Sequence, residues 1–275
     1  MRESPPGTMP SLAELTRRAV AVDGDFLALG HEVFEADGAR FVRDRSLLRI
    51  YDANYVSHVR VATPDAVERL LARVDREYPH TRHRQFLLDV STPPAVEAAL
   101  VLRGYEHSAS LVLLLEGALQ GVARAHDVRP ITSEADWAAY ARLKQRDWDE
   151  RAARLGIRDA SEVGADMFRE HRAKVPPVQY WLAWLDGTPR GFLASWPGTE
   201  GVGQVEDLYV EPEVRHRGLA TALLHRGVAD CRTRGADPVA IVADATDTPK
   251  HMYAAMGFRP LAVVHKYLLR LDDTS

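Results

Sequence analysis

The segment VEDLYVEPEVRHRGLATALL, residues 205–224, combines residue types that could bind an anion and move a proton. Glu206 and Asp207 are adjacent carboxylates within an apolar run typical of a strand. A proline ends that run, and two arginines lead to Gly218, where an amphipathic helix pattern begins. Free backbone N–H groups and a partial positive charge at a helix start suit a phosphate. The segment therefore predicts an anionic ligand at the helix start, with a proton acceptor nearby.

The two acids are expected to point in opposite directions. Side chains alternate along a strand, so Glu206, Leu208 and Val210 should share one face, and Asp207 and Tyr209 the other. The carboxylates should then not act as a pair on one face.

Two interpretations of the helix start stay open on these residues alone. The stretch RHRGLA lacks the Gly-Lys-Ser/Thr ending of a P-loop, and it is not the GxGxxG dinucleotide fingerprint. It could still cradle a phosphate, with Gly218 allowing close approach of a ligand. It could equally be a glycine at an ordinary helix start, followed by solvated arginines.

Composition narrows the classes of protein that need considering. The 275 residues are 46% hydrophobic and carry a net charge of −4, without the basic stripe of a nucleic-acid-binding domain. No apolar run approaches the ~18 residues of a membrane span, and the N-terminus lacks a signal-peptide core. The lone Cys231 allows no internal disulfide and falls on the apolar stripe of a helix. The histidines show no metal-ligand spacing. We expect a soluble, cytoplasmic protein without a metal.

The chain contains an internal repeat that bears on its architecture. Residues 89–117 and 244–272 each run from an Asp through a short loop to a helix, a Gly-aromatic pair and a long apolar strand. Asp-Gly pairs at 37–38 and 186–187 predict hairpin turns. Residues 47–52 and 55–61 are expected to be further strands, and residues 1–10 a loose tail.

The motifs resemble those of the GNAT superfamily of N-acetyltransferases. The family signature is a strand ending in Leu-x-Val, a proline, Arg/Gln-x-x-Gly-x-Gly/Ala, and a helix with a Leu-Leu pair. Arg215, Gly218 and Ala220 fill its three defining positions. Downstream, HMYAAMGF is similar to the family's Leu-Tyr-x-x-x-Gly-Phe segment, with Met252 for the leucine. The resemblance covers residues 127–275 and implies an α/β (α+β) fold with a mixed, mostly antiparallel twisted sheet flanked by helices.

The resemblance also implies a co-substrate and the residues that bind it. In this family the amides of the glycine loop hold the pyrophosphate of acetyl-CoA, while the preceding strand pairs with the pantetheine arm and brings the thioester carbonyl beside Val210. By position the implied binding residues are Leu208, Tyr209, Val210, Arg215, His216, Arg217, Gly218, Leu219, Ala220 and Thr221.

Direct attack by an amine requires a base, because an alkyl ammonium with a pKa of about 10.4 is not nucleophilic. Glu206 is the candidate base, since VEDLYV resembles the Glu-Asp strand of polyamine-type family members; Asp207 and Asp244 are fallbacks. Tyr253 occupies the family's tyrosine position, which implies that it protonates the departing thiolate. Thr246 stands where the family often has Asn, seven residues before the tyrosine.

The first half of the chain resembles a degenerate copy of the same fold. Its counterpart of the opening segment, HVRVATPDAVERLLARV, has no glycine, and Thr63 and Asp65 occupy the helix start. Tandem GNAT chains with one inactive half have this arrangement. We therefore predict two GNAT-like domains, at residues 1–117 and 127–275, joined by a linker at 118–126, with the halves packed through their last strands.

The predicted activity is acetyl-CoA-dependent transfer to a primary amine of a small molecule, catalysed by the second half. Two alternatives remain: a protein acetyltransferase acting on lysine or an N-terminus, and a non-catalytic acyl-CoA-binding regulator. The expected partner is the amine acceptor, with no nucleic acid or membrane, and a homodimer is left open.

Overall fold

The computed structural model describes residues 10–122, 124–156 and 161–271, so the predicted tail at 1–10 lies almost wholly outside the described residues. The helices are α1 (Leu12–Ala28), α2 (Pro64–Glu77), α3 (Pro94–Leu102), α4 (Glu134–Leu155), α5 (Ser161–Ala173), α6 (Leu219–Thr233) and α7 (Pro249–Ala255), with 3-10 turns η1 (Tyr51–Ala53) and η2 (Pro212–Val214). The strands are β1 (Glu32–Ala36), β2 (Ala39–Arg43), β3 (Tyr55–Ser57), β4 (His83–Leu88), β5 (Glu106–Leu115), β6 (Asp127–Pro130), β7 (Gln179–Leu185), β8 (Thr188–Trp196), β9 (Gly203–Val210), β10 (Val239–Asp244) and β11 (Arg259–Arg270).

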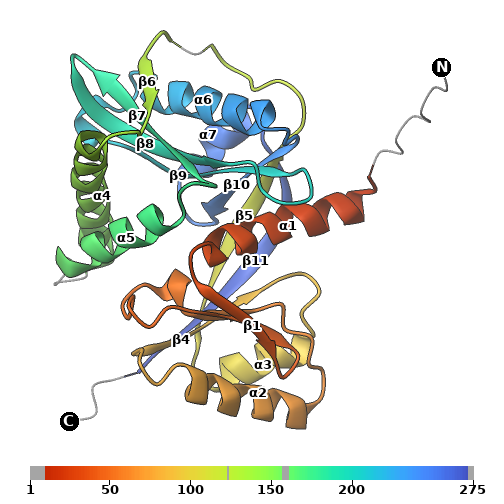
Figure 1. Cartoon of the computed structure of the whole chain (residues 1–275). Helices are drawn as coiled ribbons and strands as arrows, with labels where there is room; N and C mark the ends of the chain where they lie inside the picture. The colour runs from red at the N-terminus through yellow and green to blue at the C-terminus, as the bar shows by residue number, and fades with distance from the viewer. Residues whose placement is uncertain (1–9, 123, 157–160, 272–275) are drawn as a thin grey trace.

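The strands of the described residues form one mixed sheet in the order β1-β2-β3-β4-β11-β5-β10-β9-β8-β7-β6. The two repeated units meet at its centre, where β5 and β11 pair antiparallel, and each also pairs with a strand of the other half: β5 with β10, and β11 with β4. Figure 1 shows these two strands running through the middle of the molecule and joining its two lobes. The prediction that the halves associate through their last strands is confirmed.

Helices cover both faces of the C-terminal part of the sheet. On one face, α6 and α7 pack over β5, β7, β8, β9 and β10 in an apolar core that includes Leu193, Val205 and Leu223. On the other face, α1 and α4 share a core that includes Val22, Tyr140 and Tyr209. Helix α1 therefore belongs to the first half by sequence but buries its apolar stripe against the sheet of the second half (Figure 1).

Local sequence signals explain most helix boundaries. Ser133 and Asp136 form a capping box at the start of α4, and Ser11 accepts a hydrogen bond from the Glu14 amide at the start of α1.

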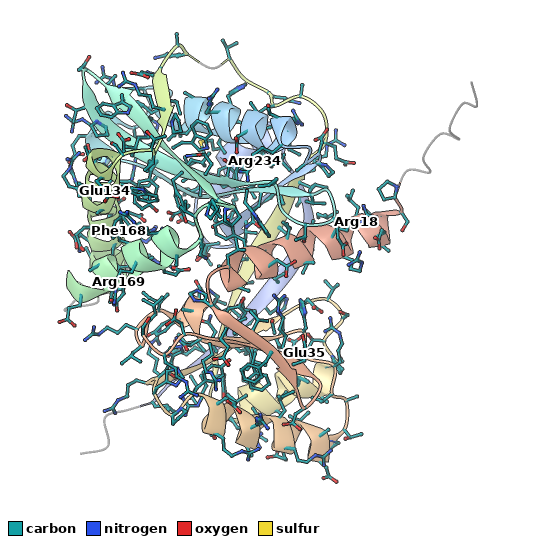
Figure 2. The ribbon with its side chains drawn as sticks, viewed as in Figure 1. Arg18, Glu35, Glu134, Phe168, Arg169 and Arg234 are labelled. Atoms are coloured by element: carbon teal, nitrogen blue, oxygen red, sulfur yellow. The ribbon has the colours of Figure 1, made fainter. Side chains whose placement is uncertain are left out.

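Helix α5 lies against α4, where the Phe168 ring packs edge-on against Trp137 at 6.0 Å; Figure 2 shows Phe168 on α5 below Glu134 of α4. These two helices supply side chains to the candidate site.

Both predicted hairpins are present, but one predicted strand is wrong. The Asp-Gly turns join β1 to β2 and β7 to β8. Residues 47–52, expected as a strand, instead form a loop into η1, because Leu47, Ile50 and Ala53 recur every third residue and pack together against α5. The strand expected at 55–61 is limited to β3, after which His58 adopts a left-handed backbone (φ 49°).

Candidate active site

The first turn of α6 leaves its amides free of side-chain caps. Gly218 is the N-cap residue, has φ 94°, and carries no side chain that could accept from the following N–H groups. His216 also adopts a left-handed backbone (φ 63°), so the chain bends sharply just before the helix. A phosphate could accept from N–H groups that the fold itself leaves unused.

The linker covers Gly218 from outside. A Cβ atom at Gly218 would lie 3.2 Å from Arg124 Cδ and 3.3 Å from His126 Nε2, and His126 Nε2 lies 2.8 Å from the carbonyl oxygen of Arg217. The positive φ angle favours glycine here, and a larger residue would also have to displace the side chains of Arg124 and His126. A cavity of about 370 Å³ continues along this side of α6, lined by Arg124, His126, Val128, Ala222, His225, Arg226 and Ala229. Glu206, the predicted base, does not line this cavity.

The Arg215 side chain binds other residues of the protein and so holds the loop between β9 and α6 in place. Its Nε donates to the Val210 carbonyl oxygen at 2.9 Å, and its guanidinium lies 2.7 Å from the Glu150 carboxylate on α4. Glu211 anchors the same turn from the other side, buried to 2% exposure between the guanidinium groups of Arg146 and Arg190. These ion pairs fix the end of β9 relative to the start of α6.

A β-bulge in β9 overturns the predicted alternation of side chains. Tyr209 pairs with Phe192 and Glu206 with Ala194, so two residues of β9, Asp207 and Leu208, stand opposite one residue of β8. Asp207 has φ 59°, which bends the strand at this point.

Both carboxyl groups consequently lie on the face covered by α1, α4 and α5. Asp207 accepts from Tyr140 of α4, whereas Glu206 is bonded to Gln204, which also contacts Asp23 of α1. The expectation that the two acids point to opposite faces is wrong, because the bulge places one extra residue between Glu206 and Tyr209. Asp207 and Tyr209 share a face as predicted, but Glu206 joins them instead of lying with Leu208 and Val210.

Just before the bulge, β9 separates from its parallel neighbour β10. The register of β9 with β10 covers only Gly203 with Val239 and Gln204 with Ala240. From Val205 onward the edge of β9 that faces β10 has no strand partner among the described strands. An extended ligand can add to such an edge as a short strand would.

Asp207 is held in a charged network. Lys144 Nζ lies 2.6 Å from Asp207 Oδ1, Tyr140 donates to Oδ2 at 2.8 Å, and His171 Nδ1 lies 3.3 Å away. Burial alone would raise the pKa of Asp207, but the Lys144 ammonium and the other donors hold it below its ordinary value. Asp207 is thus an ionised, fully engaged group and a poor proton acceptor.

Glu206 has the opposite environment. Its one hydrogen bond to a side chain among the described residues comes from Gln204 Nε2 at 3.1 Å, and no cation pairs with it. Burial, then the negative charge of Asp23, raise the pKa of Glu206 to about 8. A carboxyl with this proton affinity suits a general base working near neutral pH.

The remaining candidate residues differ in their burial and in the direction in which their pKa is changed. Tyr253 lies on α7 in the core below α6, 6% exposed, with its ring against Phe258; burial, then the charge of Glu206, raise the pKa of Tyr253 well above its ordinary value. Asp244 accepts from the amide and hydroxyl of Thr246, and these bonds outweigh burial and lower the pKa of Asp244. Cys231 is fully buried, and burial raises the pKa of its thiol to about 12, so it packs as an apolar residue.

In the first half, the helix start that corresponds to the start of α6 is capped by a side chain. Strands β3 and β4 form a parallel pair like β9 and β10, but Thr63 caps α2 by accepting from the Ala66 amide. Asp65 adds a negative charge to the same turn.

Two other expectations concern metals and membranes. In the part of the chain that the structure describes, no three His, Cys, Asp or Glu side chains are arranged to hold a metal ion. Among the described helices, none is both long and apolar enough to cross a membrane.

Comparison with solved structures shows the fold. A protein of unknown function from Staphylococcus epidermidis superimposes with a TM-score of 0.69 at 14% identity, covering 88% of this chain and 95% of that one. A tandem GNAT protein from the clavulanic acid biosynthesis pathway gives a TM-score of 0.55 at 14% identity, over 80% of this chain and 76% of that chain. At these identities the likeness establishes the fold: a mixed sheet with helices, as in tandem GNAT structures.

Sequence comparison gives the family. Residues 137–258 match the model of the acetyltransferase (GNAT) family, and the C-terminal half of the chain belongs to that family, whose members use acyl-CoA. A mycothiol acetyltransferase from Thermobispora bispora is 34% identical over 97 residues, which is 33% of this chain and 33% of that protein. The alignment thus spans about a third of this curated relative.

Proposed function

We propose that the protein is an acetyl-CoA-dependent N-acetyltransferase that acetylates a primary amine of a small molecule. The observation that carries the proposal is the juxtaposition of an uncapped helix start at Gly218 with the unpaired edge of β9. The first can bind a diphosphate, and the second can align an extended amide chain toward Glu206.

Acetyl-CoA would supply the activated acetyl group. The backbone N–H groups of residues 215–221 would donate hydrogen bonds to its diphosphate, with Arg217 exposed beside them, while Arg215 holds the loop in place. The backbone of Leu208, Tyr209 and Val210 would bond to the pantetheine arm.

Glu206 would act as the general base. The incoming amine nitrogen forms a bond to the acetyl carbon as the carbon–sulfur bond breaks, and Glu206 takes the proton that the nitrogen loses. The raised pKa of Glu206, about 8, favours this role over Asp207 and Asp244, whose pKa values are lowered.

Tyr253 would complete the proton balance by donating to the departing sulfur. Its pKa, raised by burial, keeps the phenol protonated throughout the neutral range. No hydrogen bond from the Tyr253 hydroxyl to another described residue competes for this proton.

The linker at 118–126 would separate two domains, of which only residues 127–275 would carry the coenzyme site. Thr63 and Asp65 at the start of α2 leave residues 1–117 without a phosphate cradle. A small-molecule acceptor is supported by the curated relative, whose name refers to mycothiol rather than to a protein.

Release of free CoA from acetyl-CoA tests the proposal directly. The purified chain is incubated with separate pools of small primary amines and of lysine-containing or free-N-terminal peptides. Turnover with small amines supports the proposal, and turnover with peptides alone replaces it with protein acetylation. Coenzyme binding without turnover in any pool would instead favour a non-catalytic acyl-CoA-binding protein.

A further inference from the structure

We propose that Asp23, carried by helix α1 of the N-terminal half, is a positioning residue for Glu206 and acts on it through the side-chain amide of Gln204. The inference rests on the proposed function and adds a role for the half that lacks a coenzyme site. Asp23 lies 183 positions before Glu206 in the chain.

The connection is a bridge of two hydrogen bonds. Gln204 Nε2 donates to Asp23 Oδ1 and to Glu206 Oε2, each at 3.1 Å. The amide nitrogen has two hydrogens, so both are committed. Gln204 is fully buried, and its Oε1 has no partner among the described residues, so the amide is oriented by the two acids alone.

The fold holds Asp23 at this place firmly. Its neighbour Val22 is fully buried in the core that α1 shares with β9, one turn before Phe26. Asp23 is therefore fixed against the sheet by the same apolar stripe that attaches α1 to the second half. A helix anchored in this way can hold a second carboxyl group near the base.

The charge of Asp23 and the charges around Asp23 and Glu206 explain how Asp23 affects the base. Asp23 adds negative charge beside Glu206, which disfavours the carboxylate form of Glu206. Burial also raises the pKa of Asp23 itself, to about 6. The ionisable groups facing this pair from the surrounding elements are Asp52 of η1, Lys174 just after α5, Tyr180 of β7, Asp207 of β9, Tyr253 of α7 and Lys266 of β11.

The nearby cations are engaged elsewhere. Lys174 pairs with Glu170 at 2.8 Å, and Lys266 pairs with Asp52 at 2.7 Å. Lys144 pairs with Asp207 and Asp147. Glu206 and Asp23 are thus two acids joined by an amide, with no cation of their own among the described residues, and the proton affinity of the base depends on both.

Two substitutions should move this proton affinity in opposite directions. Asp23→Asn keeps the shape and the hydrogen bond to Gln204 but removes the charge, so the apparent pKa of Glu206 should fall by about one unit or more. Gln204→Met keeps the volume but removes a donor to the carboxylate, so the pKa should rise. Asp25→Asn, on the same helix and bonded to Arg40 and Thr199, is the matched control and should leave the pKa of Glu206 unchanged.

The experiment uses the full chain with carbon-13 labelled glutamate carboxyl groups. The Glu206 signal is identified by its loss in Glu206→Gln, and its titration is followed by NMR in each folded variant, with thermal melting as the check on folding. The same shifts should appear in the acidic limb of kcat/KM against pH. A Glu206 titration that is identical in Asp23→Asn and the unmodified protein would overturn the inference.

This design separates two failures. If the unmodified protein does not turn over any amine, the proposed function falls, while the NMR titration still decides whether Asp23 acts on Glu206. If the protein is active and Asp23→Asn shifts neither the NMR titration nor the kcat/KM profile, only the role of Asp23 is lost.

Discussion

Lys144 and Asp207 form a buried ion pair, with 2.6 Å between Nζ and Oδ1, that ties helix α4 to the bulge of β9. Lys144 is 2% exposed, and Asp207 adopts a left-handed backbone at the bulge. The pair therefore secures the bulge, which follows the point at which β9 separates from β10. Glu206, the neighbouring residue, depends on this geometry for its position.

Replacing Lys144 by Met should destabilise the fold. The substitution keeps the length of the side chain but leaves the Asp207 carboxylate buried without its main cation, at an expected cost of about 3 kcal/mol in the free energy of unfolding. Urea denaturation measures the change. Lys250→Met is the control, since Lys250 Nζ bonds only to the Ala245 carbonyl oxygen among the described residues. Equal stabilities of the two variants would contradict this role of the pair.

The ion pair also has a defined pH dependence. Because the pKa of Asp207 in the folded protein lies below its ordinary value, the pair stabilises the fold fully above about pH 4. That contribution is lost only as the pH falls through the lowered pKa. In Lys144→Met the difference in stability from the unmodified protein should accordingly shrink in strong acid.

Glu206→Gln should lower kcat by about 10²–10⁴-fold, because the amide cannot accept a proton. Binding of CoA, measured by calorimetry, should stay unchanged, since the predicted coenzyme contacts are made by other residues. In the unmodified protein kcat/KM should rise with pH up to about 8, as Glu206 loses its proton. A variant with full kcat would remove Glu206 from the mechanism, and a profile without this limb would contradict the raised pKa.

Tyr253→Phe should reduce turnover far more than acetyl-CoA binding. The substitution removes only a hydroxyl group from a side chain that is otherwise packed in the core against Phe258. Steady-state kinetics with the best amine, alongside CoA calorimetry, measure the two effects separately. Tyr105→Phe, in the first half, is a control for loss of a buried phenol. An unchanged kcat would show that another donor protonates the sulfur.

The sequence predicted the elements that local signals specify. The helix after Gly218, the Asp-Gly hairpins and the meeting of the last strands all follow from short motifs or from the repeat. The bulge at Asp207 was not predictable from alternation, because an inserted residue leaves no trace in a pattern of hydrophobicity. The turn at η1 is not distinguished from a strand by its sequence, because the apolar residues spaced by three stand in a run too short to show a helical period.

Residues joined only by tertiary structure were also missed. Asp23 and Gln204 meet because α1 crosses onto the sheet of the second half, and no local signal links these positions. Arg124 covers Gly218 from a segment that the sequence indicated only as a linker. Lys144 was hidden in an amphipathic helix, although a lysine on its apolar side could have suggested a buried partner.

In the proposed function, the amides at the start of α6 bind the diphosphate of coenzyme A. Isothermal calorimetry of CoA with the unmodified protein and with Gly218→Asp tests it most directly, and Gly235→Asp, at a glycine of similar φ with open space around it, controls for backbone strain. We expect saturable binding to one site in the unmodified protein and in Gly235→Asp, and loss of that binding in Gly218→Asp. Absence of binding to the intact protein, or equal binding by Gly218→Asp, would contradict it.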